Sequence, residues 1–256
     1  MPPIKDDKLY NAVYYYNLAL GSKSIENSLA LLWTAMESCL PYRVAVADVD
    51  CVRVLLSKVL ALGCIARDVY SLTKRFKMSY NHNKHILGNC GIQALKRIDS
   101  NKHIKLNIKW LSEKNENRFL KVKESSDLLA YDYSKLGQLL SKGKSVDLLN
   151  RILGSKESVS YQLQRIYINR NQIIHAGDFI SEYTNLWMNM EWYVGKMLSF
   201  MIITELNEKS ISDSFKEVES DYDYLVSYLD KNKKVLISDL PARIQNILYN
   251  QVWQSF

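Results

Sequence analysis

Residues 157–177 read ESVSYQLQRIYINRNQIIHAG. Val159, Leu163 and Ile166 recur at helical spacing, which predicts one buried stripe along a helix over 157–176. Arg170 falls at the centre of that stripe, where a guanidinium is costly unless an anion pairs with it. Gly177 follows as the expected left-handed end of the helix. The stretch therefore predicts a helix that carries a cation in need of a partner near its end.

The rest of the chain has the same helical periodicity. Nine glycines and four prolines in 256 residues are few, which favours long helices over turn-rich β structure. The stretch 48–80 is expected to form one long helix, or two helices that meet at Gly63, and Gly154 is expected to end a short helix over 145–153. We therefore expect an all-α protein. The other expected helices cover 6–20, 24–40, 92–98, 103–141, 157–176, 179–207, 211–230 and 240–252.

Charge is distributed unevenly along the chain and suggests its organisation. Residues 74–123 hold thirteen Lys and Arg against three acids, whereas 205–230 hold eight acids against two lysines. We expect one helical domain over 1–256, with core segments at about 6–80 and 145–207. A basic helical insertion over 81–144, centred on 81–125, and acidic C-terminal helices over 208–256 would complete it.

The basic stretch, with aromatic residues between its cations, suits a polyanion, although a solvated helix face has the same composition. The side chains expected to bind an RNA backbone are Lys74, Arg75, Lys77, Lys102, Lys105 and Lys109.

Several classes of protein are disfavoured by missing patterns. The N-terminus lacks a cleavable signal, and the most apolar run, 54–66, is too short to span a bilayer. We therefore expect no membrane partner. Gly-rich phosphate loops and G-x-S-x-G sequences are absent, which argues against an ATPase or a hydrolase of those kinds.

The cysteines and histidines predict neither disulfides nor a metal site. Four cysteines without a C-x-x-C pair are read as reduced thiols of a cytoplasmic protein. His82, His85, Cys90 and His103 form an irregular ligand set, and histidines in a basic loop more often contact solvent or phosphate. We expect no metal and no cofactor.

The end of the 157–176 helix carries groups that suit phosphodiester chemistry. Asn171 and His175 are four residues apart and are therefore neighbours on the helix surface. An arginine can bind two phosphate oxygens, and an imidazole can exchange a proton near neutral pH. No metal is needed if the nucleophile is the ribose 2′-hydroxyl, which would restrict the substrate to RNA. Because one imidazole cannot easily be both base and acid, a two-fold dimer would supply the second.

The segment RNQIIH, 170–175, resembles the R-(N/D/H)-x3–5-H signature of the HEPN superfamily, and the longer RNQIIHAG resembles its Apea-like branch. LALLWTAMESCL, 29–40, is similar to the first core helix of that branch, where an acidic residue commonly faces the arginine; Glu37 occupies that position. The resemblance implies Arg170 and His175 as catalytic residues, Asn171 as a supporting residue and Glu37 as the orienting carboxylate.

The same resemblance implies a helical bundle, a homodimer and a metal-independent endoribonuclease with a composite site at the dimer interface. Such domains are often toxins or anti-phage effectors, with RNA and frequently tRNA as the target. An antitoxin or a sensor subunit is a candidate regulatory partner.

A second interpretation gives the same residues structural roles. His175 would stabilise the carboxyl end of its helix through the helix dipole, and Arg170 would form an ion pair with Glu37. The chain would then be a non-catalytic helical adaptor that binds nucleic acid or a partner protein.

Overall fold

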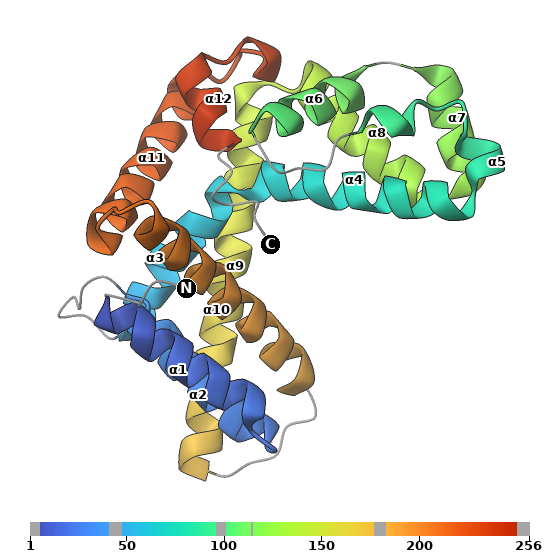
Figure 1. Ribbon diagram of the computed structural model, residues 1–256. Coiled ribbons are helices and arrows are strands. Elements are labelled where there is room, and N and C mark those ends of the chain that lie inside the picture. Colours follow the sequence, from blue (N-terminus) through green and yellow to red (C-terminus); the bar gives the residue numbers. More distant parts are fainter. Residues whose placement is uncertain (1–5, 41–47, 96–100, 114, 177–182, 250–256) are drawn as a thin grey trace. The chain divides into compact units, whose positions relative to one another are not determined.

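The computed structural model describes residues 6–40, 48–95, 101–113, 115–176 and 183–249. These residues form twelve α-helices and no β-strand, with a single antiparallel bridge between Lys144 and Leu236 (Figure 1). The all-α prediction is confirmed. The helices are α1 (Asp7–Gly21), α2 (Ile25–Ser38), α3 (Asp48–Leu62), α4 (Cys64–His82), α5 (Lys84–Leu87), α6 (Asn101–Ser112), α7 (Glu116–Ser125), α8 (Asp127–Lys142), α9 (Ser145–Ala176), α10 (Tyr183–Leu206), α11 (Ile211–Lys231) and α12 (Ala242–Leu248).

The chain divides into two compact units, each described by itself. The first comprises Met1–Leu60 and Ser155–Ser220, and the second comprises Ala61–Gly154 and Asp221–Ser255. Residues 61–80, which the sequence grouped with 6–60, belong with 81–154 in the second unit. The basic stretch 74–123 therefore lies within the second unit.

Helix α2 lies at the centre of the first unit, where it packs against both α1 and α10 (Figure 1). The Ser28 hydroxyl joins the three helices: it donates to the Ala19 carbonyl at 2.7 Å and accepts from the Trp187 indole N–H at 2.6 Å. Ser24 caps the helix by accepting from the Asn27 amide. The apolar stripe expected here is buried: Leu29, Leu32, Trp33 and Met36 of α2 are inaccessible, and Leu40, just beyond the end of the helix, is 7% exposed.

Helix α9 is longer than expected. It runs without a break through Gly154, so the prediction of a helix end at that glycine is wrong. A glycine inside a helix costs only about 0.5–1 kcal/mol, whereas burying one leucine or isoleucine side chain contributes about 1.5–3 kcal/mol. Ile152 before the glycine and Leu163 after it are both fully buried, and this burial outweighs the cost. Of the two alternatives for 48–80, the structure has the pair of helices that meet at Gly63, because α3 ends at Leu62 and α4 begins at Cys64.

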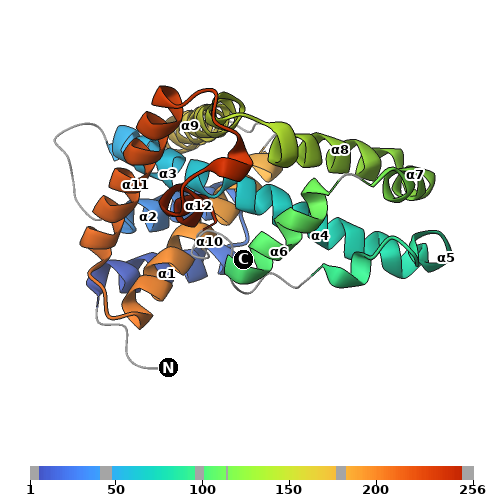
Figure 2. The ribbon, with the colours of Figure 1, turned by 90° about the horizontal axis from the view of Figure 1, so that it is seen from above.

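Three aromatic rings form the centre of the second unit. Phe76 of α4, Trp110 of α6 and Tyr133 of α8 meet with ring centroids 5.4–5.9 Å apart. The three helices that carry these rings contact one another (Figure 2). Arg118 of α7 covers the Trp110 ring at 4.0 Å and donates to the Trp110 carbonyl at 2.7 Å. This carbonyl is one of the last four of α6, which have no partner within the helix. The buried guanidinium thus caps the carboxyl end of α6 and joins a fourth helix to the aromatic cluster.

Candidate functional site

Arg170 is half-buried near the carboxyl end of α9, in the first unit. Its Nη1 donates to the Asn171 side-chain oxygen at 2.9 Å, and its Nε is buried without an acceptor. Within the described ranges no carboxylate pairs with this guanidinium. The stripe on which it lies is buried as predicted, with Leu163 and Ile166 fully inaccessible. The guanidinium therefore keeps hydrogen-bonding capacity that the described residues do not use.

Glu37 is half-buried on α2 and accepts a hydrogen bond from the Trp33 indole at 2.5 Å. The Trp33 ring also contacts the ring of Tyr167 of α9, with centroids 5.3 Å apart. The helices that carry the two resembling segments, α2 and α9, are therefore in contact through these two rings. Arg170 makes no hydrogen bond to Glu37, so the ion pair that the structural interpretation expects between these two residues is not formed.

His175 belongs to the last turn of α9, which ends at Ala176. The His175 side chain and Gly177 lie outside the described residues. The position of His175 on the helix is nevertheless informative, because residues seven apart on an α-helix differ by only about 20° in direction. Tyr161 and Ile168, fourteen and seven positions earlier, are exposed at 67% and 46%. Tyr161 and Ile168 thus form an exposed apolar row on α9, and by helical phase position 175 follows them on the same side of the helix.

The residues expected to bind an RNA backbone all fall in the second unit, on two helices that contact each other. Arg75 differs from the rest because it is paired with Asp132 at 2.6 Å. Three of the lysines are exposed and have no acidic partner among the described residues. The exposed lysines are Lys74, Lys105 and Lys109. Lys77 is half-buried, and the side chain of Lys102 is not among those that the structure describes.

The aromatic residues of the basic stretch do not all serve a binding surface. Trp110 is only 7% exposed and belongs to the aromatic cluster of the second unit, so it is unavailable for stacking on bases. Arg118, counted among the cations of this stretch, is buried against it. Fewer cations of this stretch are therefore on the surface than the number of Lys and Arg in its sequence suggests.

All four cysteines are free, as predicted. Burial raises the pKa of the Cys39 thiol to about 12 and that of Cys64 to about 11. Across the described ranges, no three His, Cys, Asp or Glu side chains gather as a metal site. None of the helices in these ranges combines the length and apolar character that crossing a bilayer requires.

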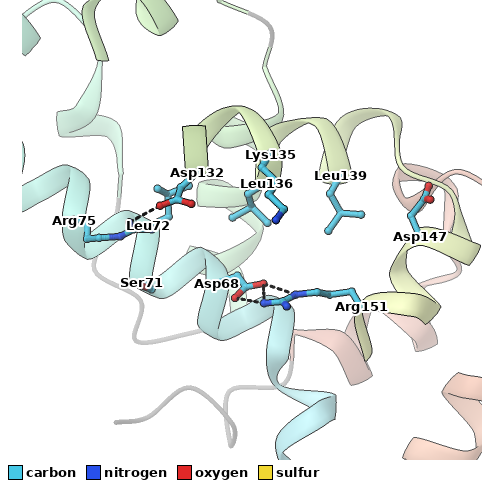
Figure 3. Close-up of a pocket in the computed structure, with 10 residues that line it drawn as sticks. All are labelled: Asp68, Ser71, Leu72, Arg75, Asp132, Lys135, Leu136, Leu139, Asp147 and Arg151. Atoms are coloured by element: carbon cyan, nitrogen blue, oxygen red, sulfur yellow. Dashed lines mark hydrogen bonds and ion pairs between the residues drawn. The ribbon is translucent and has the colours of Figure 1, made fainter. Parts of the chain in front are cut away.

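A cleft in the second unit was not predicted from the sequence. Helices α4, α8 and the start of α9 enclose a volume of about 480 Å³ (Figure 3). The spacing i, i+3, i+4, i+7 occurs on both α4 and α8, and this repeated pattern could have revealed two helix faces that line one cleft. The lining residues are Asp68, Ser71, Leu72 and Arg75 of α4, Asp132, Lys135, Leu136 and Leu139 of α8, and Asp147 and Arg151 of α9.

Comparisons of the chain with models of known protein families, with curated proteins and with solved structures give no match.

Proposed function

We propose that this protein is a metal-independent endoribonuclease of the HEPN type that works as a homodimer. The observation that carries the proposal is the state of Arg170. A half-buried guanidinium without an acidic partner among the described residues is costly, and a bound phosphate would compensate it. The hydrogen bond to Asn171 holds the guanidinium in place before the phosphate arrives.

The proposed reaction requires only side chains of the protein and a group of the RNA itself. The 2′-oxygen attacks the adjacent phosphorus while the bond to the 5′-oxygen breaks, which leaves a 2′,3′-cyclic phosphate and a free 5′-hydroxyl. His175 of one protomer accepts the 2′-hydroxyl proton, and His175 of the other protonates the leaving oxygen. Arg170 stabilises the charge that develops on the non-bridging oxygens. Glu37 would act on the site by positioning α2 against α9.

The exposed row on α9 supports the dimeric arrangement. Large apolar side chains on an outer helix face often mark an interface, and here Tyr161 and Ile168 lead to position 175. In an isologous interface the same row meets itself across the two-fold axis. Two copies of position 175 would then belong to one composite site.

The second unit would hold the RNA backbone. Lys74, Lys105 and Lys109 are exposed cations without acidic partners in the described part of the chain, as phosphate contacts require. Such contacts give affinity without sequence preference, so binding should weaken steeply as salt is raised. With tRNA as the substrate, the protein would act as a cytoplasmic toxin or anti-phage effector, restrained by an antitoxin or a sensor subunit.

The test is cleavage of total tRNA by the purified chain in the presence of EDTA. We expect products with 2′,3′-cyclic phosphate ends. Arg170→Ala should lower the rate by roughly 100- to 1,000-fold, and His175→Ala by roughly 100-fold or more. Arg165→Ala, which removes an exposed arginine of the same helix, is the matched control and should cleave normally.

Two outcomes would contradict the proposal. Intact tRNA together with salt-sensitive RNA binding would favour the non-catalytic adaptor. Activity that survives both Arg170→Ala and His175→Ala would place the reaction elsewhere. Circular dichroism of each variant separates loss of function from loss of fold.

A further inference from the structure

The cleft of the second unit has the size and floor of a small-molecule site. Sites for small ligands usually enclose roughly 300–1,000 Å³ and are lined mainly by apolar groups with a few polar ones. The cleft measures about 480 Å³, and Leu72, Leu136 and Leu139 line it from two facing helices (Figure 3). Seven of its ten lining residues are polar or charged, and its apolar surface comes from these leucines, of which Leu72 is 1% and Leu136 8% exposed.

Two arginine–aspartate pairs cancel most of the charge around this floor. Arg75 of α4 contacts Asp132 of α8 at 2.6 Å. Arg151 of α9 binds both carboxylate oxygens of Asp68 of α4, at 2.8 and 2.9 Å (Figure 3). Each pair joins different helices, so both pairs fix the walls of the cleft and leave no net charge.

The third acid of the lining, Asp147, is also compensated. Its carboxylate accepts a hydrogen bond from the Lys144 backbone amide at 2.8 Å, at the amino end of α9. A carboxylate in this position caps the helix and is stabilised by the helix dipole. It therefore attracts an added cation less than a free carboxylate would.

Lys135 is the cation of the lining that makes no ion pair with a described carboxylate. Its side chain projects from α8 into the space between α4 and α8 (Figure 3). Its ammonium group lies 5.7 Å from the centre of the exposed Tyr131 ring, and no carboxylate within the described ranges pairs with it. The cleft thus combines an apolar floor with one ammonium group that no described carboxylate pairs with, in a lining whose three aspartates and three cations carry no net charge.

We propose that this cleft binds a small organic monoanion, an apolar body with a single carboxylate. The apolar body would cover the three leucines, and the carboxylate would bind the Lys135 ammonium group. A polyanion is disfavoured, because the three aspartates of the lining balance its three cations and leave no surplus positive charge to attract several negative ones. The proposal concerns the second unit alone and does not depend on RNA cleavage.

The test measures how tightly the full chain binds three probes of similar size. They are the anionic 2-naphthoate, the neutral 2-naphthalenemethanol and the cationic 2-naphthylmethylammonium. Titration calorimetry should give a submillimolar Kd for 2-naphthoate, with the other two binding at least roughly tenfold more weakly. Lys135→Met should remove that preference, because the substitution keeps the length of the side chain and deletes its charge. Lys123→Met, an exposed lysine of the same unit outside the cleft, should bind 2-naphthoate like the wild type.

A second variant tests the location. Ser71→Phe places a ring at the exposed edge of the lining and should weaken all three probes by roughly tenfold or more. The proposal is overturned by no 2-naphthoate binding at millimolar concentration, or by equal affinities for the three probes. It is overturned equally if folded Lys135→Met, or folded Ser71→Phe, binds 2-naphthoate like the wild type.

Discussion

Replacing Arg118 by alanine should destabilise the second unit strongly, although the residue lies in a stretch that looks like a solvated basic surface. The side chain is only 8% exposed. Its loss leaves the Trp110 carbonyl without its donor, which costs about 1–3 kcal/mol for a buried acceptor. It also removes the contact of the guanidinium with the indole ring, worth about 0.5–2 kcal/mol. Because these terms overlap, we expect a total loss of about 2–4 kcal/mol.

The measurement must report on the second unit alone, since the two compact units need not unfold together. Hydrogen exchange followed by mass spectrometry gives opening free energies for peptides that cover α6 and α8. Arg118→Ala should lower these values by the stated amount. Arg118→Lys should fall in between, because lysine keeps the charge but not the planar fork that covers the ring.

Glu113→Gln is the matched control. Glu113 is half-exposed and lies 3.6 Å from the Arg118 guanidinium, so this ion pair should contribute no more than about 1 kcal/mol. If Glu113→Gln costs as much as Arg118→Ala, the ion pair and not the helix cap holds the guanidinium. A loss below about 1 kcal/mol for Arg118→Ala would refute the proposed role of Arg118 as a buried cap.

Three further predictions concern two glycines, a tyrosine and a cysteine. Gly143→Ala should cost about 1–3 kcal/mol in urea denaturation, because a β-carbon there would overlap the Leu139 carbonyl oxygen. Gly154→Ala, where the β-carbon meets nothing, should instead stabilise by about 0.5–1 kcal/mol, and equal effects at both positions would contradict the packing described. Burial, and then its hydrogen bond to Glu191, raise the pKa of Tyr16 to about 12. Stability should therefore fall from about pH 10 to pH 12, where the unfolded chain has lost this proton and the folded chain keeps it; urea titrations of Tyr16→Phe should show a shallower fall, and an identical slope would argue against the shift. The buried Cys39 thiol, with its raised pKa, should resist a disulfide reagent at pH 8 in the native protein and react in urea, so rapid native labelling of Cys39 would contradict its burial.

Local periodicity predicted the helices whose burial follows a single stripe. The buried face of α2 and the stripe through Leu163 and Ile166 on α9 were both foreseen, because side chains on one helix face recur every three or four residues. The two glycines at 63 and 154 look alike in sequence and behave differently, since only packing on both sides of a glycine decides whether the helix continues.

Charge counts were a weaker guide, because pairing depends on residues far away in the chain. Arg75 finds its partner Asp132 on a helix 57 residues further on. Arg118 is buried through contacts that composition does not record. The division into two units likewise depends on contacts between distant segments, which no window of sequence contains. For the α9 site, the sequence indicated which side chains to test but not that Arg170 would lack Glu37 as a partner.

The hydroxyl of Ser28 sets an order in which this protein could change during evolution. An indole N–H only donates, whereas a hydroxyl both donates and accepts. If Ser28 became alanine first, the partly buried Trp187 N–H would lose its acceptor. If Trp187 became phenylalanine first, Ser28 would still donate to Ala19 and no buried donor would be left without an acceptor. Lineages that have replaced both residues should therefore have passed through intermediates with serine and phenylalanine, and alanine beside tryptophan should be rare.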